Sequence, residues 1–216
     1  MFGTTGISIV ISLIILLFSA ILHEIAHGAV AEYFGDDTAR NAGRITLNPL
    51  VHIDPYFTIL VPLILVLSGS PVIFGAAKPV PVNYFNLRNY RWGVFWVSIA
   101  GVLTNLFLAA VFSIPLHFAS LPAAAANLFV TIVEINVFLA VINMIPIPPI
   151  DGSKVFAALI GVRAINWIVK IEMRGLWGIL PFIILIYFLF TTQAFQGVLL
   201  PVAGFFFHIF GVNVGF

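Results

Sequence analysis

The sequence predicts an all-α membrane protein that crosses the bilayer several times. Of its 216 residues, 62% are hydrophobic and only 8% are charged, and the mean hydropathy is +1.16. Soluble globular domains carry about 25% charged residues, so this composition excludes that class. Most of the apolar runs also approach the roughly 20 residues that a spanning helix needs. These runs lie at about residues 7–34, 56–74, 92–119, 123–146, 176–192 and 197–214.

The apolar runs predict five or six spanning helices in one domain. The connecting segments are short, and the sequence contains no internal repeat and no low-complexity linker. We therefore expect a single domain over residues 1–216, with a core at about 7–156 and C-terminal helices at 176–214. The first run has no basic stretch before it and no cleavage-like site, so we expect a retained helix rather than a signal peptide.

Charge and cysteine content exclude further classes of function. The formal net charge is only +1, and the nine basic residues are spread over three loops, which does not fit a nucleic-acid-binding surface. The chain has no cysteine, so disulfides and thiolate zinc sites are excluded. Histidine and carboxylate side chains remain as strong zinc ligands.

The basic residues predict which loops face the cytoplasm. They form three groups, and the positive-inside rule places all three on the cytoplasmic side. The groups are Arg40 and Arg44; Lys78, Arg88 and Arg91; and Lys154, Arg163, Lys170 and Arg174. The 56–74 run must then be re-entrant, which Pro62 and the breaker at 68–71 permit. The alternative is that 56–74 spans fully and the middle group lies outside.

A metal-binding motif lies inside the first apolar run, in its cytoplasmic half. In His23-Glu24-Ile25-Ala26-His27 the two histidines share one helix face, so they can bind a single zinc ion. In such sites the Glu is the general base that takes a proton from water activated by the metal. Ionisable groups at membrane depth cost roughly 2.5–3.5 kcal/mol each, so we expect this cluster to have a function. The motif predicts hydrolysis.

A catalytic zinc usually has three protein ligands, so the chain must supply another. Five candidates are weak, because they lie near the ends of apolar runs, in the outer half of a helix or in a polar loop. These are His52, Asp54, His117, Glu134 and His208.

The strongest candidate for the third ligand is Asp151, which follows three prolines within residues 146–149. The prolines break the helix and predict an extended segment, which is tolerated at membrane depth only where it lines a cavity or is buried in protein. Asp151 would be presented into that cavity. The alternative is a Pro-Pro-Asp-Gly turn that merely ends a helix at the interface.

The chain resembles the site-2 protease family of intramembrane zinc metalloproteases. Its two signatures are His-Glu-x-x-His and Asn-x-x-Pro-x-Pro-x-x-Asp-Gly, and both are present in full, at 23–27 and 143–152. The resemblance covers about residues 20–156. Within the family, the chain is similar to short forms without PDZ or CBS modules. One departure is Gly101-Val102-Leu103-Thr104-Asn105, because family members commonly have a proline after this glycine.

The resemblance implies one Zn²⁺ per chain, bound by His23, His27 and Asp151, with Glu24 as the base. It also makes Asn143 a candidate to orient the substrate or polarise the scissile carbonyl. The implied reaction is hydrolysis of peptide bonds within or near transmembrane segments of membrane proteins. The implied location is the cell membrane, with the active site toward the cytoplasm.

Three further expectations concern other parts of the chain. Asn136 either lines the same cleft as Asn143 or serves as a packing amide between helices. Residues 152–175 predict one amphipathic helix on the inner leaflet, and the Pro- and Gly-rich stretch 69–86 is a candidate strand or loop for pairing with an unwound substrate. Gly35 is expected to stop the first helix.

Two other functions stay open at the level of sequence. A metal-ion transporter or channel could use the same His and Asp side chains as a permeation site. The second half of the chain has almost no polar residues for such a path, which disfavours this alternative. A catalytically silent scaffold would not need an intact base and ligand set.

Overall fold

The computed structural model describes residues 6–60, 63–64, 67, 77–118, 120–175, 177–178, 180–182, 184–185 and 195–212. Over these residues the protein is helical, with turns and irregular segments and no strand. In chain order the elements are α1 (Gly6–Tyr33), α2 (Thr38–Asn41), η1 (Pro49–His52), η2 (Pro55–Leu60), η3 (Tyr84–Asn86), α4 (Tyr90–Phe118), α5 (Ala123–Asn143), α6 (Asp151–Ile160), α7 (Val162–Glu172), η4 (Phe195–Leu199) and α9 (Leu200–Ile209).

Three of the described helices are long and apolar enough to cross a membrane. They correspond to the runs predicted at 7–34, 92–119 and 123–146, and their spanning parts are Ser8–Tyr33, Tyr90–Phe118 and Ala123–Asn143. The last predicted run contains the shorter apolar helix Gly197–Ile209. Most of the runs predicted at 56–74 and 176–192 lies outside the described residues. The three long helices are consistent with a membrane protein.

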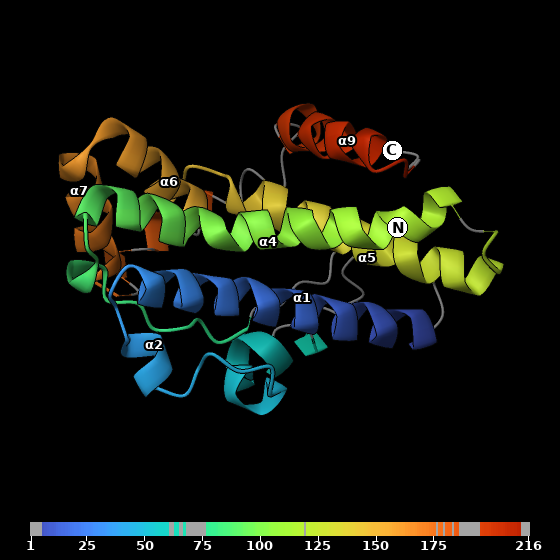
Figure 1. The fold of residues 1–216 in the computed structure, drawn as a ribbon, viewed down its shortest axis with the longest axis horizontal. Helices are drawn as coiled ribbons and strands as arrows, with labels where there is room; N and C mark the ends of the chain where they lie inside the picture. The colour runs from blue at the N-terminus through green and yellow to red at the C-terminus, as the bar shows by residue number, and fades with distance from the viewer. Residues whose placement is uncertain are drawn as a thin grey trace.

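The long helices run side by side, and α4 packs against both α1 and α5 (Figure 1). The short helices α2, α6 and α7 gather at one end of this bundle, beside the end of α1 and the beginning of α4. Helix α9 packs against α5. The apolar contact among α4, α5 and α9 contains Ala109, Val133, Val137, Val141, Ala203, Phe207 and Val212.

The three basic groups of the sequence lie at the same end of the bundle. The Arg88 amide donates to the Phe34 carbonyl at 2.7 Å, and the Arg44 guanidinium donates to the Lys78 carbonyl at 2.8 Å. Arg91 Nε donates to the Ala158 carbonyl at 2.7 Å. The chain between α1 and α4 therefore begins and ends at one end of the bundle.

Helix α1 stops where the sequence predicts. Gly35 has a φ of +102°, a conformation that favours glycine, and the Asp36 amide donates back to the Ala31 carbonyl at 2.9 Å. This is the usual glycine-terminated C-cap, which satisfies carbonyls at the helix end.

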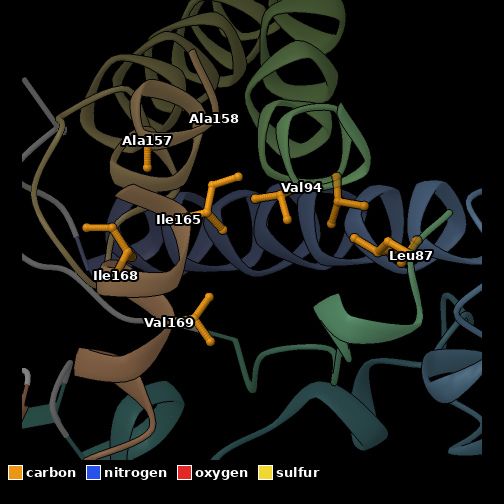
Figure 2. Close-up of a cluster of buried hydrophobic side chains, with 9 residues drawn as sticks. Leu87, Val94, Ala157, Ala158, Ile165, Ile168 and Val169 are labelled. Atoms are coloured by element: carbon orange, nitrogen blue, oxygen red, sulfur yellow. The ribbon is translucent and has the colours of Figure 1, made fainter. Parts of the chain in front are cut away.

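Residues 152–175 form two helices, so the prediction of a single amphipathic helix is wrong. Gly161, with a φ of +143°, separates α6 from α7, because this conformation is rarely open to other residues. The bend lets both helices cover the ends of α1 and α4 (Figure 2). The buried cluster there contains Ala31, Leu87, Val94, Val97, Ala157, Ala158, Ile165, Ile168 and Val169.

Lys154, a basic residue of the segment predicted as an amphipathic helix, is only 5% exposed. Its Nζ lies 2.6 Å from Glu172 Oε1 on α7 and 5.8 Å from the centre of the Tyr84 ring. Burial by itself would lower the pKa of the Lys154 ammonium, but the nearby Tyr84, Glu172 and Asp151 groups raise it above its usual value. The cation therefore ties α6 to α7 and to the segment before α4.

Candidate metal centre

Helix α1 presents two histidines to the interior of the bundle. His23 and His27 are one turn apart, and both residues are buried. Their Nε2 atoms lie 3.0 Å apart. The i, i+4 spacing that the sequence predicts thus brings two nitrogen ligands to one point.

The third group comes from the loop after α5. Residues 144–150 form consecutive turns, with the Ile147 amide donating to Ile145 and the Ile150 amide donating to Ile147, so the predicted extended conformation is wrong. The prolines do end the helix as expected. A Cβ on Gly152 would lie 2.5 Å from the Met144 carbonyl oxygen, so only glycine lets α6 begin against this turn.

This close return places Asp151, the first residue of α6, opposite the histidines. Its Oδ2 lies 3.0 Å from His23 Nε2 and 3.1 Å from His27 Nε2. Asp151 and the two histidines therefore lie in one cluster, and their role as metal ligands stays a prediction. Over the described residues, these three form the group able to hold a metal ion.

The arrangement of the three ligand atoms fits zinc. Tetrahedral zinc with bonds of about 2.0–2.1 Å places neighbouring ligand atoms about 3.3 Å apart. The observed separations of 3.0, 3.0 and 3.1 Å need only a small outward shift. Two imidazoles and one carboxylate are a usual catalytic zinc set, which leaves the fourth position for water or substrate.

Helix α4 supports both histidine rings on the side away from this centre. His27 Nδ1 donates to the Val97 carbonyl at 2.6 Å, and His23 Nδ1 lies 2.6 Å from Asn105 Oδ1. A proton on Nδ1 leaves the lone pair on Nε2, which is the nitrogen that faces the centre.

Gly101 on α4 makes room for the His23 ring. A Cβ there would lie 2.5 Å from His23 Nε2 and 2.6 Å from His23 Nδ1, so any larger residue would displace the imidazole. Gly101 and Asn105 are four residues apart and share one helix face. Both residues of this Gly-x-x-x-Asn sequence therefore contact His23.

Glu24 follows His23 on α1 and is half-buried. Its Oε2 accepts a hydrogen bond from the Val80 amide at 2.7 Å. Val80 belongs to the irregular segment 77–83, which is anchored by the Lys78 amide on the His52 carbonyl at 2.7 Å. The described part of the 69–86 stretch contains no strand, and residues 69–76 lie outside the described residues.

Comparison with known proteins connects this geometry to a family. The chain is 36% identical over 199 residues to "Putative zinc metalloprotease YwhC" of Bacillus subtilis (strain 168), an alignment that covers 87% of this chain and 83% of the relative. The chain belongs to the site-2 protease family.

Other relatives are more distant or longer. The chain is 30% identical over 166 residues to "Putative zinc metalloprotease MJ0611" of Methanocaldococcus jannaschii, an alignment that covers 73% of this chain and 78% of the relative. It is 29% identical over 143 residues to Rip2 of Mycolicibacterium smegmatis, where it covers 63% of this chain but 52% of the relative. The chain thus spans about half the length of Rip2. No protein-family model matches the chain. No solved structure matches it either.

In this site-2 protease family member, Asn136 and Asn143 of α5 lie in different surroundings. Asn143 is the last residue of α5, and its Nδ2 donates to the Leu139 carbonyl at 2.9 Å, so the amide lies back on its own helix. Its catalytic role stays a prediction. Asn136 is fully buried and bonds to Asn105 at 2.9 Å, which is the packing arrangement rather than a cleft-lining one.

The weaker ligand candidates have other surroundings. His52 is fully buried, and its Nε2 donates to the Thr46 carbonyl at 2.9 Å. His117 bonds to the Ser113 carbonyl at 2.9 Å, and Asp54 Oδ1 accepts from the Tyr56 amide at 2.8 Å. None of the five joins His23 and His27 in the described metal-binding group.

The sequence did not single out Gly101, Asn105 or Val80 as groups that contact the site. The first two carried a signal, because their spacing of four places both on one face of a predicted helix. Val80 acts through its backbone amide, so its side chain gave no indication of this role.

Proposed function

We propose that this chain is an intramembrane zinc metalloprotease of the site-2 protease type, with one Zn²⁺ per chain. Its substrates are membrane proteins, cleaved within or near a transmembrane segment. It is a multi-pass protein of the cell membrane, surrounded by lipid, with the active site toward the cytoplasmic side.

The observation that carries this proposal is the position of the cluster along α1. His23 lies ten residues before Tyr33, the last residue of the helix, which corresponds to about 15 Å along the axis. The hydrocarbon core of a bilayer is about 30 Å thick. A hydrolytic site at this depth is within reach of a peptide bond that is itself in or near the membrane.

Each residue of the metal centre has its own role in the proposed reaction. His23, His27 and Asp151 hold the zinc, which when bound lowers the pKa of water to about 7 and polarises the scissile carbonyl. Glu24 takes a proton from the attacking water and gives it to the leaving amine. The Val80 amide holds the Glu24 carboxylate in place at 2.7 Å. Asn143 polarises the carbonyl after its amide turns away from Leu139.

The basic groups support the proposed orientation. Arg44, Arg88 and Arg91 all make contacts at the end of the bundle that carries α2, α6 and α7. By the positive-inside rule this end faces the cytoplasm. Water can then reach the metal site from that side.

The proposal is tested with Glu24→Gln and Asp151→Ala, assayed for cleavage of single-span membrane proteins in proteoliposomes and for bound zinc. We expect Glu24→Gln to keep zinc and to lose cleavage by about 10²- to 10⁴-fold, the usual contribution of a general base. We expect Asp151→Ala to lose zinc as well. Glu32→Gln is the matched control, because this carboxylate lies on the same helix and pairs with Arg40 at the surface.

The same variants separate the protease from a metal transporter. A transporter would need the ligands but not the base, so Glu24→Gln would carry zinc across the membrane at the wild-type rate. Cleavage at the wild-type rate by Glu24→Gln would contradict the assigned base. Full zinc occupancy in Asp151→Ala would remove the third ligand.

A further inference from the structure

A chain of buried polar side chains leads away from His23 into the helix bundle. His23 Nδ1 lies 2.6 Å from Asn105 Oδ1, Asn105 Nδ2 lies 2.9 Å from Asn136 Oδ1, and Asn136 Nδ2 lies 3.0 Å from Ser19 Oγ. All four residues are at most 6% exposed. The chain passes from α1 to α4 and α5 and returns to α1.

The direction of these hydrogen bonds is set at the far end, by a backbone carbonyl. Asn136 Nδ2 also lies 2.9 Å from the Ile132 carbonyl, which can only accept, so the nitrogen of this amide must face it. Asn136 Oδ1 therefore faces Asn105 and requires a donor there. Asn105 supplies its Nδ2, which turns its Oδ1 toward His23.

An amide oxygen facing His23 decides where the imidazole carries its proton. Because Asn105 Oδ1 can only accept, His23 Nδ1 must donate. The lone pair of His23 is then on Nε2, the atom that lies 3.0 Å from both His27 Nε2 and Asp151 Oδ2. Reversing any one bond would leave amide groups unpaired in a buried site, which is costly.

We propose that Asn105, oriented by Asn136 and Ser19, is a positioning residue that fixes the tautomer and ring direction of His23 for metal binding. The two histidines are therefore supported differently, because His27 donates to the Val97 backbone carbonyl at 2.6 Å. The inference rests on the metal site of the proposed function. It concerns the affinity of that site rather than the cleavage reaction.

The test measures zinc affinity of the purified full-length protein by competition with a chromophoric chelator, with thermal unfolding recorded for each variant. The main variant is Asn105→Leu/Asn136→Leu, which removes the acceptor for His23 while leaving no unpaired amide between α4 and α5. Asn105→Asp keeps an oxygen facing His23 Nδ1 in either protonation state. Ser113→Ala is the control, because this buried serine of α4 donates to the Ala110 carbonyl and does not contact the site.

We expect the double leucine variant to unfold near the wild-type temperature and to bind zinc about 10- to 100-fold more weakly, as is usual when a histidine loses its supporting partner. Asn105→Asp should restore most of the affinity, and Ser113→Ala should not change it. Wild-type affinity in the double variant would overturn the proposal. So would an Asn105→Asp protein that folds but binds zinc as weakly as the leucine variant.

These outcomes are independent of proteolysis. If no membrane substrate is cleaved by the wild type but the affinities follow the expected order, the proposed function fails and the role of Asn105 stands. If cleavage depends on Glu24 but the zinc affinities of the Asn105 variants equal that of the wild type, the role of Asn105 fails and the proposed function stands.

Discussion

Helix α4 makes two contacts of different kinds with its neighbours. Toward its beginning it meets α1 through the metal-side contact, where Val97, Gly101 and Asn105 support the two histidines. Toward its end it meets α5 and α9 through the apolar contact, which includes Ala109, Val133 and Phe207. The first contact sets the direction of two imidazole rings, and the second holds helices together.

The difference shows what each contact demands from the sequence. Helix association in membranes relies on van der Waals packing and interhelical hydrogen bonds, because lipid is as apolar as the side chains. The apolar contact therefore needs suitable volumes and tolerates exchange among them. The metal-side contact needs a missing side chain at Gly101 and an oxygen at Asn105, which few substitutions can supply.

The largest effect on the metal-side contact is expected from Gly101→Ala. The added Cβ would lie 2.5 Å from His23 Nε2, so the ring must move. We expect zinc affinity, measured by chelator competition, to fall by at least about 10-fold. Gly204→Ala on α9 is the matched control, because no heavy atom lies within 4 Å of the added Cβ. Equal zinc affinity in the two variants would mean that the close approach of α4 to His23 is unimportant.

The apolar contact is tested by Phe207→Ala, which should affect stability but not the metal. Phe207 is 2% exposed, and its loss should lower the free energy of unfolding by about 1–3 kcal/mol. This is below the cost in a water-soluble core, because lipid also solvates phenyl rings. Phe205→Ala, at an exposed position of the same helix, serves as the control. A fall in zinc affinity of the folded Phe207→Ala protein would contradict the separation of the two contacts.

Much of the fold and the metal site could be predicted because the deciding rules are local. Apolar length predicted the three long helices, and Gly35 predicted the end of α1. The spacing of His23 and His27 predicted that they share a face. The place of Asp151 beside the histidines could be predicted because the prolines end the helix and let the chain return toward α1. The turns that bring it there were not predicted.

The rest depends on contacts between distant parts of the chain. The sequence around Lys154 indicates a surface cation, because its ion-pair partner Glu172 lies on the next helix and is brought to it only by the fold. The bond from His23 to Asn105 joins residues 82 positions apart. Gly161 carried a recognisable signal for a break, but the amphipathic pattern of the residues around it favoured one continuous helix.

The smallest effect on zinc binding is expected at Asp36, a buried polar group that lies at the end of α1 but outside the metal-side contact. Its carboxylate accepts hydrogen bonds from the Asn83 amide at 2.7 Å, from Asn86 Nδ2 at 2.9 Å and from Thr38. Burial by itself would raise the pKa of the Asp36 carboxyl, but these bonds outweigh burial and hold the pKa below its usual value of 3.8. They attach the segment before α4 to the end of α1.

Because the pKa of Asp36 is lowered in the folded state, the ionised carboxylate stabilises the fold at pH values above the unfolded-state pKa, and this contribution is lost as the pH falls through the folded-state pKa. We expect Asp36→Asn to lower the free energy of unfolding by about 1–3 kcal/mol at pH 7, and the difference from wild type to shrink below about pH 4. Thermal unfolding in detergent between pH 7 and pH 3 measures both, with the exposed neighbour Asp37→Asn as the control. A difference that stays constant down to pH 3 would show that charge on Asp36 is not what holds this segment. Zinc affinity at pH 7 should be unchanged in Asp36→Asn. This result would show that zinc binding depends on the buried polar groups that contact the histidines and not on buried polar groups elsewhere.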